Sequence, residues 1–314
     1  MTRVPLKGDK MSEKPDIQDK PALIFSDKYF VSFGEHVFPT DKYRKIFDKL
    51  KASSKIDSFQ VLEPLPANTE DLELVHLPDY VRDFMNFEST QQTISSELPL
   101  DKEIRDFFLL AAGGSILAAE ESLKRGRAIN LNGGFHHAFP DHAEGFCYLN
   151  DPAIAVRKVM KDKKIKKAAV VDCDLHQGNG TAYIFKRDKK VFTYSIHQDD
   201  IYPVKQTSDF DVGLSDDAGD EEYLAHLERE MPVIYDRHQP ELVCYVAGAD
   251  PYIDDQLGTL RLTKKGLRAR DDIVIKEATS RGIAIFIVLA GGYAFDTNDV
   301  VDIHTQTAAA LLED

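Results

Sequence analysis

Three ionisable side chains stand at alternate positions where an apolar run ends. In KKAAVVDCDLH, residues 166–176, they are Asp172, Asp174 and His176. Alternate side chains of an extended chain point to the same face, and burying an unpaired carboxylate is costly. A cation would make this arrangement favourable, so the segment predicts a metal site. The alternative is that these side chains cap helices and turns.

A second apolar run adds a further ligand to the predicted metal site. Asp250 ends ELVCYVAGAD, residues 241–250, and with Asp174 and His176 it makes a set of three protein ligands. Zinc accepts carboxylate oxygen and imidazole nitrogen, and a catalytic zinc keeps one position open. Ferrous iron and cobalt share this preference, so the residue types leave the metal open. Asp172 is a candidate to orient a histidine from behind. Taken by itself, Asp250 would be interpreted as a turn cap.

Two adjacent histidines, His136 and His137, end the apolar run RAINLNGGFHH, residues 127–137. Neighbouring side chains of an extended segment point to opposite sides, so we do not expect both to bind one ion. Histidine titrates near neutral pH, which favours an acid–base role for the pair. The alternative is a solvated loop or a helix cap.

A tyrosine, Tyr293, ends the apolar run AIFIVLAGGY, residues 284–293. At the mouth of a crevice its hydroxyl could donate a hydrogen bond to a developing oxyanion. Without that context, the usual role of such a tyrosine is to pack its ring and find any partner for its hydroxyl.

The elements that position these residues follow one plan. Apolar runs typical of strands buried on both faces lie at residues 127–137, 166–176, 190–200, 241–250 and 284–293. Helices are predicted at residues 101–126, 151–164, 221–238 and 263–282. The alternation predicts an α/β fold, a single-domain, doubly wound and mainly parallel sheet flanked by helices. Ligands bind at the carboxyl ends of such strands, so we expect the polar clusters to converge on one crevice.

The bulk composition limits the class of protein. Of the 314 residues 43% are hydrophobic, which is enough for one large domain, expected over residues 21–314. Residues 1–20 have mixed charge and no apolar core, which predicts a poorly ordered tail and no secretory signal. No apolar run approaches the ~20 residues that span a membrane. The three cysteines never form CxxC, which argues against a disulfide framework and favours the cytoplasm.

The charge limits the partners. A net charge of −14 argues against direct nucleic-acid binding, because phosphate binding needs a basic surface. Acidic residues are dense within 199–230, which is typical of a solvated loop and helix start. The alternative is an acidic rim that steers cationic substrates. The oligomeric state is left open by the sequence.

Taken together, these stretches resemble the zinc-dependent histone deacetylase family, which includes bacterial deacetylase-like amidohydrolases and acetylpolyamine hydrolases. The matching motifs are GGFHHAFPDHAEGFCYLND (133–151), VVDCDLHQGNGTAYIF (170–185), TYSIHQDDIYP (193–203), VAGADPY (246–252) and LAGGYAF (289–295). Weaker matches are HVFPTDKYRKIFDKL (36–50) and LVHLPDYV (74–81). The resemblance implies the arginase/deacetylase fold. The HVFPTDKY start and the short length look most like the class IV branch or bacterial histone-deacetylase-like proteins.

The resemblance implies metal positions. Those for zinc are Asp174, His176 and Asp250. A structural monovalent cation, K⁺ or Na⁺, would be bound by main-chain oxygens of Asp172, Asp174 and His176 together with Ser195, and a second such site would lie near Phe185.

The resemblance also implies catalytic roles. His136 and His137 would be the tandem active-site histidines, Asp172 would pair with His136, and Tyr293 would polarise the substrate carbonyl. One departure is Asn179, where some branches carry aspartate. A neutral amide would orient His137 while stabilising its protonated form less strongly.

A tunnel for the acyl-lysine side chain is implied as well. Gly145 and Phe146 would line it, Tyr202 would form the opposite wall, and Gly291 and Gly292 would contact the substrate.

The implied function is a zinc-dependent amide hydrolase that removes acetyl or longer acyl groups from lysine side chains of proteins or peptides. The nearest alternative is a deacetylase of small acetylated amines such as acetylpolyamines. A ureohydrolase of similar fold needs two bridged metals and more ligands than this sequence places. A non-catalytic binding protein would not need Tyr293, His136 and His137 together.

Overall fold

The computed structural model describes residues 20–313, so the tail predicted at residues 1–20 lies outside the described residues except for Lys20. Within this range, eight strands form one parallel sheet in the order β2-β1-β3-β8-β7-β4-β5-β6. The strands are β1 (Ala22–Ile24), β2 (Gln60–Leu62), β3 (Arg127–Asn130), β4 (Ala168–Asp172), β5 (Val191–Gln198), β6 (Phe210–Leu214), β7 (Leu242–Val246) and β8 (Ala284–Val288).

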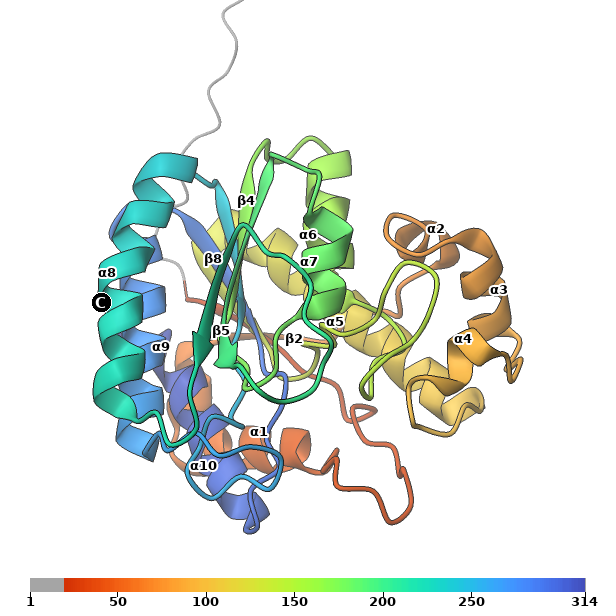
Figure 1. Cartoon of the computed structure of the whole chain (residues 1–314), viewed down its shortest axis with the longest axis horizontal. Coiled ribbons are helices and arrows are strands. Elements are labelled where there is room, and N and C mark those ends of the chain that lie inside the picture. The colour runs from red at the N-terminus through yellow and green to blue at the C-terminus, as the bar shows by residue number, and fades with distance from the viewer. Residues whose placement is uncertain (1–19, 314) are drawn as a thin grey trace, which may run out of the picture.

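Helices cover both faces of this sheet. They are α1 (Lys42–Ala52), the 3-10 helix η1 (Lys55–Ser58), α2 (Thr69–Leu72), α3 (Pro78–Met85), α4 (Gln91–Ile94), α5 (Lys102–Arg125), α6 (Asp151–Lys161), α7 (Asn179–Phe185), α8 (Asp220–His238), α9 (Lys264–Thr279) and α10 (Thr297–Ala310). Helices α5, α6 and α7 pack on one face, and α1, α8, α9 and α10 pack on the other (Figure 1). The short helices α2, α3 and α4 lie beyond α5 and α6 (Figure 1). The arrangement is the predicted doubly wound α/β sheet.

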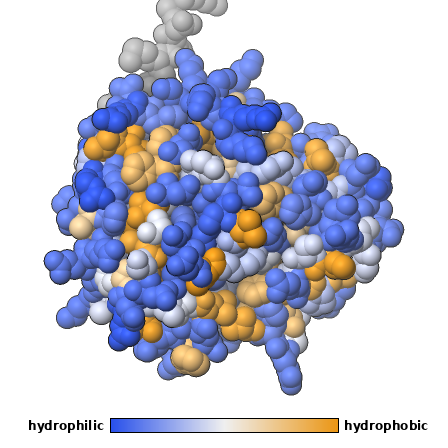
Figure 2. Space-filling model, in the orientation of Figure 1, coloured by the Kyte–Doolittle hydropathy of each residue, from blue (hydrophilic) through white to orange (hydrophobic). Residues whose placement is uncertain are grey.

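The central strands are apolar because they are buried on both faces of the sheet, as their sequences predict. Every residue of β3, β4, β7 and β8 is buried, because helices cover both faces. These strands and β5 occupy the five predicted runs, and α5, α6, α8 and α9 occupy the four predicted helices. The polar surface that remains is seen in Figure 2, where apolar side chains are interspersed among mainly hydrophilic ones. None of the helices within residues 20–313 is long and apolar enough to cross a membrane.

A pair of glycines lets the long helix α5 approach its neighbours closely. A Cβ atom at Gly113 would overlap the carbonyl oxygen of Leu65, and one at Gly114 would overlap the hydroxyl of Tyr29. Each glycine costs helix stability of about 1 kcal/mol relative to alanine. Here that cost is offset by close packing of α5 against the segments that carry the two neighbours.

Four neighbouring strands point their carboxyl ends toward one place. The order β3-β8-β7-β4 runs without interruption through the middle of the sheet. His136 and His137 follow β3, Tyr293 follows β8, Asp250 follows β7, and the DCDLH motif spans the end of β4. The predicted site residues therefore come from adjacent strands although they are far apart in the sequence.

Candidate active site

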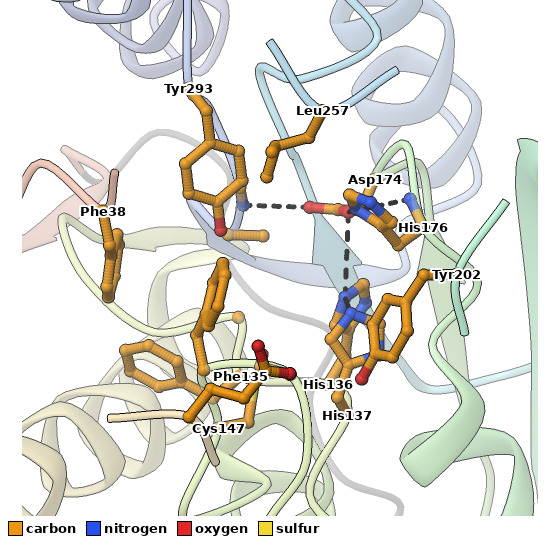
Figure 3. A pocket seen from close by; sticks show the side chains of 16 residues that line it. Phe38, Phe135, His136, His137, Cys147, Asp174, His176, Tyr202, Leu257 and Tyr293 are labelled. Carbon is orange, nitrogen blue, oxygen red and sulfur yellow. Dashed lines mark hydrogen bonds and ion pairs between the residues drawn. The ribbon is translucent and has the colours of Figure 1, made fainter. Parts of the chain in front are cut away.

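A pocket of about 280 Å³ opens at the carboxyl ends of these strands. Figure 3 shows its lining, in which Asp174 and His176 lie on one side, Tyr293 lies across from the two histidines, and Tyr202 stands beside them. The predicted crevice is therefore present, and most of the predicted site residues face it.

The three predicted metal ligands converge beneath this pocket. One ligand atom from each of Asp174, His176 and Asp250 lies within 4.8 Å of the others, and all three residues are buried. Nδ1 of His176 is 3.5 Å from Oδ1 of Asp174 and 3.6 Å from Oδ2 of Asp250. Among residues 20–313, Oδ2 of Asp250 has no hydrogen-bond partner. A buried carboxylate oxygen without a donor, beside an imidazole nitrogen, fits a divalent ion such as zinc.

Two glycines leave room for the carboxylates. A Cβ atom at Gly291 would overlap the carboxylates of Asp250 and Asp174, and one at Gly248 would do the same. The Gly291 N–H also donates to Oδ2 of Asp174 at 2.9 Å. The backbone thus approaches the predicted ligands as closely as only glycine permits.

The geometry of the DCDLH motif comes from a turn more than from a strand. Strand β4 ends at Asp172, so side-chain alternation along a strand does not extend to the next two residues. Instead, Oδ1 of Asp172 accepts the N–H of Asp174 at 3.1 Å, and Oδ1 of Asp174 accepts the N–H of His176 at 3.0 Å. These local side-chain-to-backbone bonds direct Asp174 and His176 toward the same point.

The paired histidines also converge, contrary to the expectation that they would diverge. Nε2 of His136 lies 3.1 Å from Nε2 of His137. The expectation assumed an extended segment, but the chain after β3 is a loop in which Gly133 and Gly134 have φ of +81° and +89°. Behind the pair, Nδ1–H of His136 donates to Oδ2 of Asp172 at 2.7 Å, as the resemblance implies. Because the acceptor is a carboxylate, Nδ1 of this ring carries a proton.

The histidines differ in electrostatics. Burial opposes the charge on His136, but Asp172 and Asp174 outweigh it and raise the pKa of His136 to about 9. Burial, together with the charges of His136 and His176, holds the pKa of His137 well below its ordinary value. A charged His136 therefore donates Nε2–H to a neutral His137.

The metal group carries an excess of negative charge. Burial disfavours the imidazolium of His176, but the nearby carboxylates of Asp174 and Asp250 raise its pKa to about 10. Burial and the charge of Asp174 raise the pKa of Asp250 to about 6. Two carboxylates that compete for one proton favour a cation between them.

Tyr293 is positioned by its backbone. Its side chain is buried at the pocket wall (Figure 3). The Tyr293 N–H donates to Oδ2 of Asp255 at 2.7 Å, and its carbonyl accepts from Nε2 of Gln256 at 2.7 Å. Sequence reasoning missed Asp255, although it is a further acid just after Asp250. Within residues 20–313, the hydroxyl of Tyr293 makes no hydrogen bond to another residue.

The residues that the resemblance assigns to a tunnel wall, Gly145, Phe146 and Tyr202, line the pocket. The Phe146 ring lies 6.0 Å from the Tyr293 ring, and the Tyr202 ring lies 5.3 Å from His137. Gly145 passes beneath Tyr202, where a Cβ atom would overlap the Tyr202 hydroxyl. Additional lining residues that sequence reasoning did not single out are Phe38, Glu97, Phe135, Cys147, Leu257 and Ala290.

Some predicted residues lie away from the pocket. Gly292 does not line it, and a Cβ atom there would contact Val300 and Ala249. Ser195 lies beside Asp172 in the register of β4 and β5, where the monovalent cation is predicted. Phe185, near which a second monovalent cation is predicted, is buried at the end of α7 and does not line the pocket.

Comparisons with known proteins agree with this geometry. Residues 36–309 match the histone deacetylase domain. The chain is 39% identical over 275 residues to an uncharacterised protein of Picosynechococcus sp., covering 86% of this chain and 91% of the other. It is 29% identical over 290 residues to Histone deacetylase 2 of Arabidopsis thaliana, covering 87% and 75%. It is 27% identical over 278 residues to the histone deacetylase-like amidohydrolase of Pseudomonas aeruginosa, covering 82% and 73%.

The fold is shared with a solved structure. The crystal structure of the HDA15 HD domain superimposes with a TM-score of 0.77 at 23% identity, covering 93% of this chain and 91% of that one. This is the arginase/deacetylase fold that the motifs imply. With the domain match over nearly the whole chain, the buried Asp-His-Asp group and this topology, the protein belongs to the histone deacetylase family of hydrolases.

Proposed function

We propose that the chain hydrolyses the amide bond of acylated lysine side chains in proteins or peptides, with zinc held by Asp174, His176 and Asp250. The observation that carries the proposal is the buried ligand group at the floor of a pocket that also holds two histidines and a tyrosine hydroxyl. When bound, zinc supplies Lewis-acid chemistry, polarising a carbonyl oxygen and lowering the pKa of water. Ferrous iron and cobalt suit the same donors.

His137 is the proposed general base and acid. Its Nδ1–H donates to Oδ1 of Asn179 at 2.8 Å, so Nε2 is the atom that can accept a proton. The low pKa keeps this ring neutral, and His137 lines the pocket. His137 takes a proton from the attacking water and returns it to the leaving amine. His136, charged and held by Asp172, supplies positive potential beside it.

Tyr293 is the proposed oxyanion donor, and the aromatic walls hold the substrate. A well-placed donor to a developing oxyanion contributes about 3–4 kcal/mol. Phe146 and Tyr202 offer apolar faces to the methylene chain of lysine, while Gly145 and Gly291 let the backbone come close.

Further parts of the proposal rest on the sequence motifs. We propose that residues 21–314 form one catalytic domain. We also propose that the chain is class IV-like, which the motif at 36–50 supports, and that it is located in the cytoplasm. We also propose a structural K⁺ or Na⁺ near Asp172 and Ser195, supported by their adjacent register, and another near Phe185.

The test compares zinc-loaded wild type with Tyr293→Phe. Wild type should hydrolyse an acetyl-lysine peptide, and the variant should lose about 10²–10³-fold in kcat with unchanged zinc content and thermal unfolding. Faster turnover of N-acetylputrescine than of the peptide would support the alternative substrate class instead. Absence of hydrolysis of both substrates by zinc-loaded wild type would contradict the proposal.

A further inference from the structure

The hydrogen bonds behind His137 continue beyond Asn179. Nδ2 of Asn179 donates to Oε1 of Glu144 at 2.7 Å, and the Tyr202 hydroxyl donates to the same oxygen at 3.1 Å. The other oxygen, Oε2, lies 3.5 Å from Nε2 of His142 near the surface. His137, Asn179 and Glu144 thus form a continuous chain of hydrogen bonds.

We propose that Glu144 is a positioning residue that fixes the amide of Asn179 and, through it, the tautomer of His137. The inference deepens the proposed function and rests on it. An asparagine amide can present either its oxygen or its NH₂ group to a neighbour. A carboxylate only accepts hydrogen bonds, so Glu144 selects the orientation in which Nδ2 faces Glu144 and Oδ1 faces His137.

The tautomer matters because only one ring nitrogen faces the pocket. With Oδ1 of Asn179 as acceptor, the His137 proton resides on Nδ1, and Nε2 carries the lone pair that accepts a proton. A flipped amide would instead donate to Nδ1 and place the ring proton on Nε2, where it blocks the general base. The Gly180 N–H also donates to Oδ1 at 2.9 Å, so Glu144 reinforces an orientation that the backbone already favours.

The side chain of Glu144 is held at the correct distance by a tight turn. The Glu144 N–H donates to the Cys147 carbonyl at 3.1 Å, and the Cys147 N–H donates to the Glu144 carbonyl at 2.9 Å. Between them Gly145 and Phe146 have φ of +51° and +63°, which is the geometry of a type I′ turn. The turn that places Phe146 in the tunnel wall therefore also places Glu144 beside Asn179.

Glu144 restores a charge that Asn179 lacks. Some branches of the family carry an aspartate at the position of Asn179. In this chain the carboxylate belongs to Glu144, which is linked to His137 through the amide of Asn179. Burial opposes the charge on Glu144, but hydrogen bonds from His142, Asn179 and Tyr202 lower its pKa, so it is ionised at neutral pH. Charge-assisted bonds of this kind are stronger than neutral ones.

The kinetic test exchanges the two partners. Glu144→Ala should lower kcat about 10-fold with KM changed less than about 2-fold, because it removes an orienting partner. Asn179→Asp should also lower kcat, because two carboxylates would face each other. The double variant N179D/E144Q should recover about 10-fold over Asn179→Asp, since a glutamine NH₂ group can donate to the new carboxylate. Asp141→Asn, which removes the same charge in the same loop, is the matched control.

A second readout is independent of hydrolysis. In metal-free protein, ¹⁵N chemical shifts of the His137 ring should show the Nδ1–H tautomer in wild type and Asp141→Asn, and a mixture in Glu144→Ala. If zinc-loaded wild type is inactive, the proposed function fails while the ring shifts still test the inference. The inference is overturned if Glu144→Ala keeps both the wild-type kcat and the Nδ1–H tautomer. It is also overturned if E144Q changes kcat by the same factor in the wild-type background as in the N179D background.

Discussion

The two Nε2 atoms of His136 and His137 lie 3.1 Å apart and share one proton, which their surroundings assign to His136. Asp172 stabilises the charged ring, whereas Asn179 offers a neutral acceptor to the other ring. Asp172 and Asp174 thus favour the charged form of His136, whereas burial and the neighbouring charges of His136 and His176 keep His137 neutral.

Site residues could be identified from the sequence where they belong to a motif that follows a strand. The two missed positioning residues, Glu144 and Asp255, contact Asn179 and Tyr293 across sequence separations of 35 and 38 residues. No local pattern encodes such contacts, because they depend on how loops fold over the sheet edge. Glu144 stands within a quoted motif, but its partner becomes visible only in three dimensions.

Gly291 offers a prediction at the scale of one atom. Gly291→Ala should weaken zinc binding by at least ~10-fold, because the added Cβ atom would displace the carboxylates of Asp174 and Asp250. Competition with a zinc chelator measures the affinity. Gly219→Ala is the matched control, since its Cβ atom would meet only the Arg261 carbonyl oxygen at 3.8 Å. Equal zinc affinities of the two variants would refute the idea that Gly291 leaves room for the ligand carboxylates.

Among the elements, the loop between residues 139 and 150 contributes Gly145, Phe146 and Cys147 to the pocket wall, and one buried ring contacts both of its ends. Nδ1–H of His76 donates to the Phe139 carbonyl at 2.9 Å, and Nε2 accepts the Asn150 N–H at 3.1 Å. The ring therefore bridges both ends of the loop that contains Glu144 and Phe146. Since Nε2 must accept, the bridge requires a neutral histidine.

This bridge predicts an acid-sensitive stability. Burial lowers the pKa of His76 from 6.5 to about 4, despite backbone acceptors that raise it. The unfolded chain binds the proton first, so stability is lost as the pH falls from 6.5 toward 4. At pH 5 the loss amounts to about 2 kcal/mol.

Urea unfolding at pH 7.5 and pH 5 measures this loss. His76→Gln cannot titrate there, so its free energy of unfolding should fall about 2 kcal/mol less than that of wild type between the two pH values. Burial also lowers the pKa of His197 and His304, but both proteins contain these residues and their contributions cancel. Parallel pH dependences of the two proteins would exclude the bridge as the cause.

The elements were predictable where apolar runs are long. The strands that position the site, β3, β4, β7 and β8, are wholly buried and stand out as continuous apolar runs. Strand β1 has only three residues, β2 has two exposed residues and β6 has three, so their sequences lack such a run. The site was accessible to sequence reasoning because it lies on the most buried part of the sheet.

At the scale of the whole molecule, the acidic stretch 199–230 has a largely structural role. Asp209 accepts from the Thr193 N–H, Asp220 accepts from the Thr263 N–H, and Asp216 accepts from Gln198 and Thr259. These carboxylates tie the loop and the start of α8 to their neighbours. Asp199 and Asp200 are exposed. They lie within three residues of Tyr202, which lines the pocket.

Long-range attraction is tested by salt. If the net charge of −14 steers cationic substrates, raising NaCl from 50 to about 300 mM should raise KM several-fold for a lysine-rich acetylated peptide. A neutral peptide with the same acetyl-lysine should respond less, because screening affects only charged partners. Identical responses of the two peptides would leave the acidic stretch with its structural role alone.

The order of strands in the sheet has a consequence for synthesis on the ribosome. Strands β3 and β4 are translated early, but the two places between them belong to β7 and β8, which end at Val246 and Val288. A nascent chain that stops after α8 therefore has a vacancy in the middle of its sheet and lacks Asp250 and Tyr293. A product that ends before Val288 lacks Tyr293 and all or part of β8, so the arrangement of side chains at the pocket forms only once nearly the whole chain has been made.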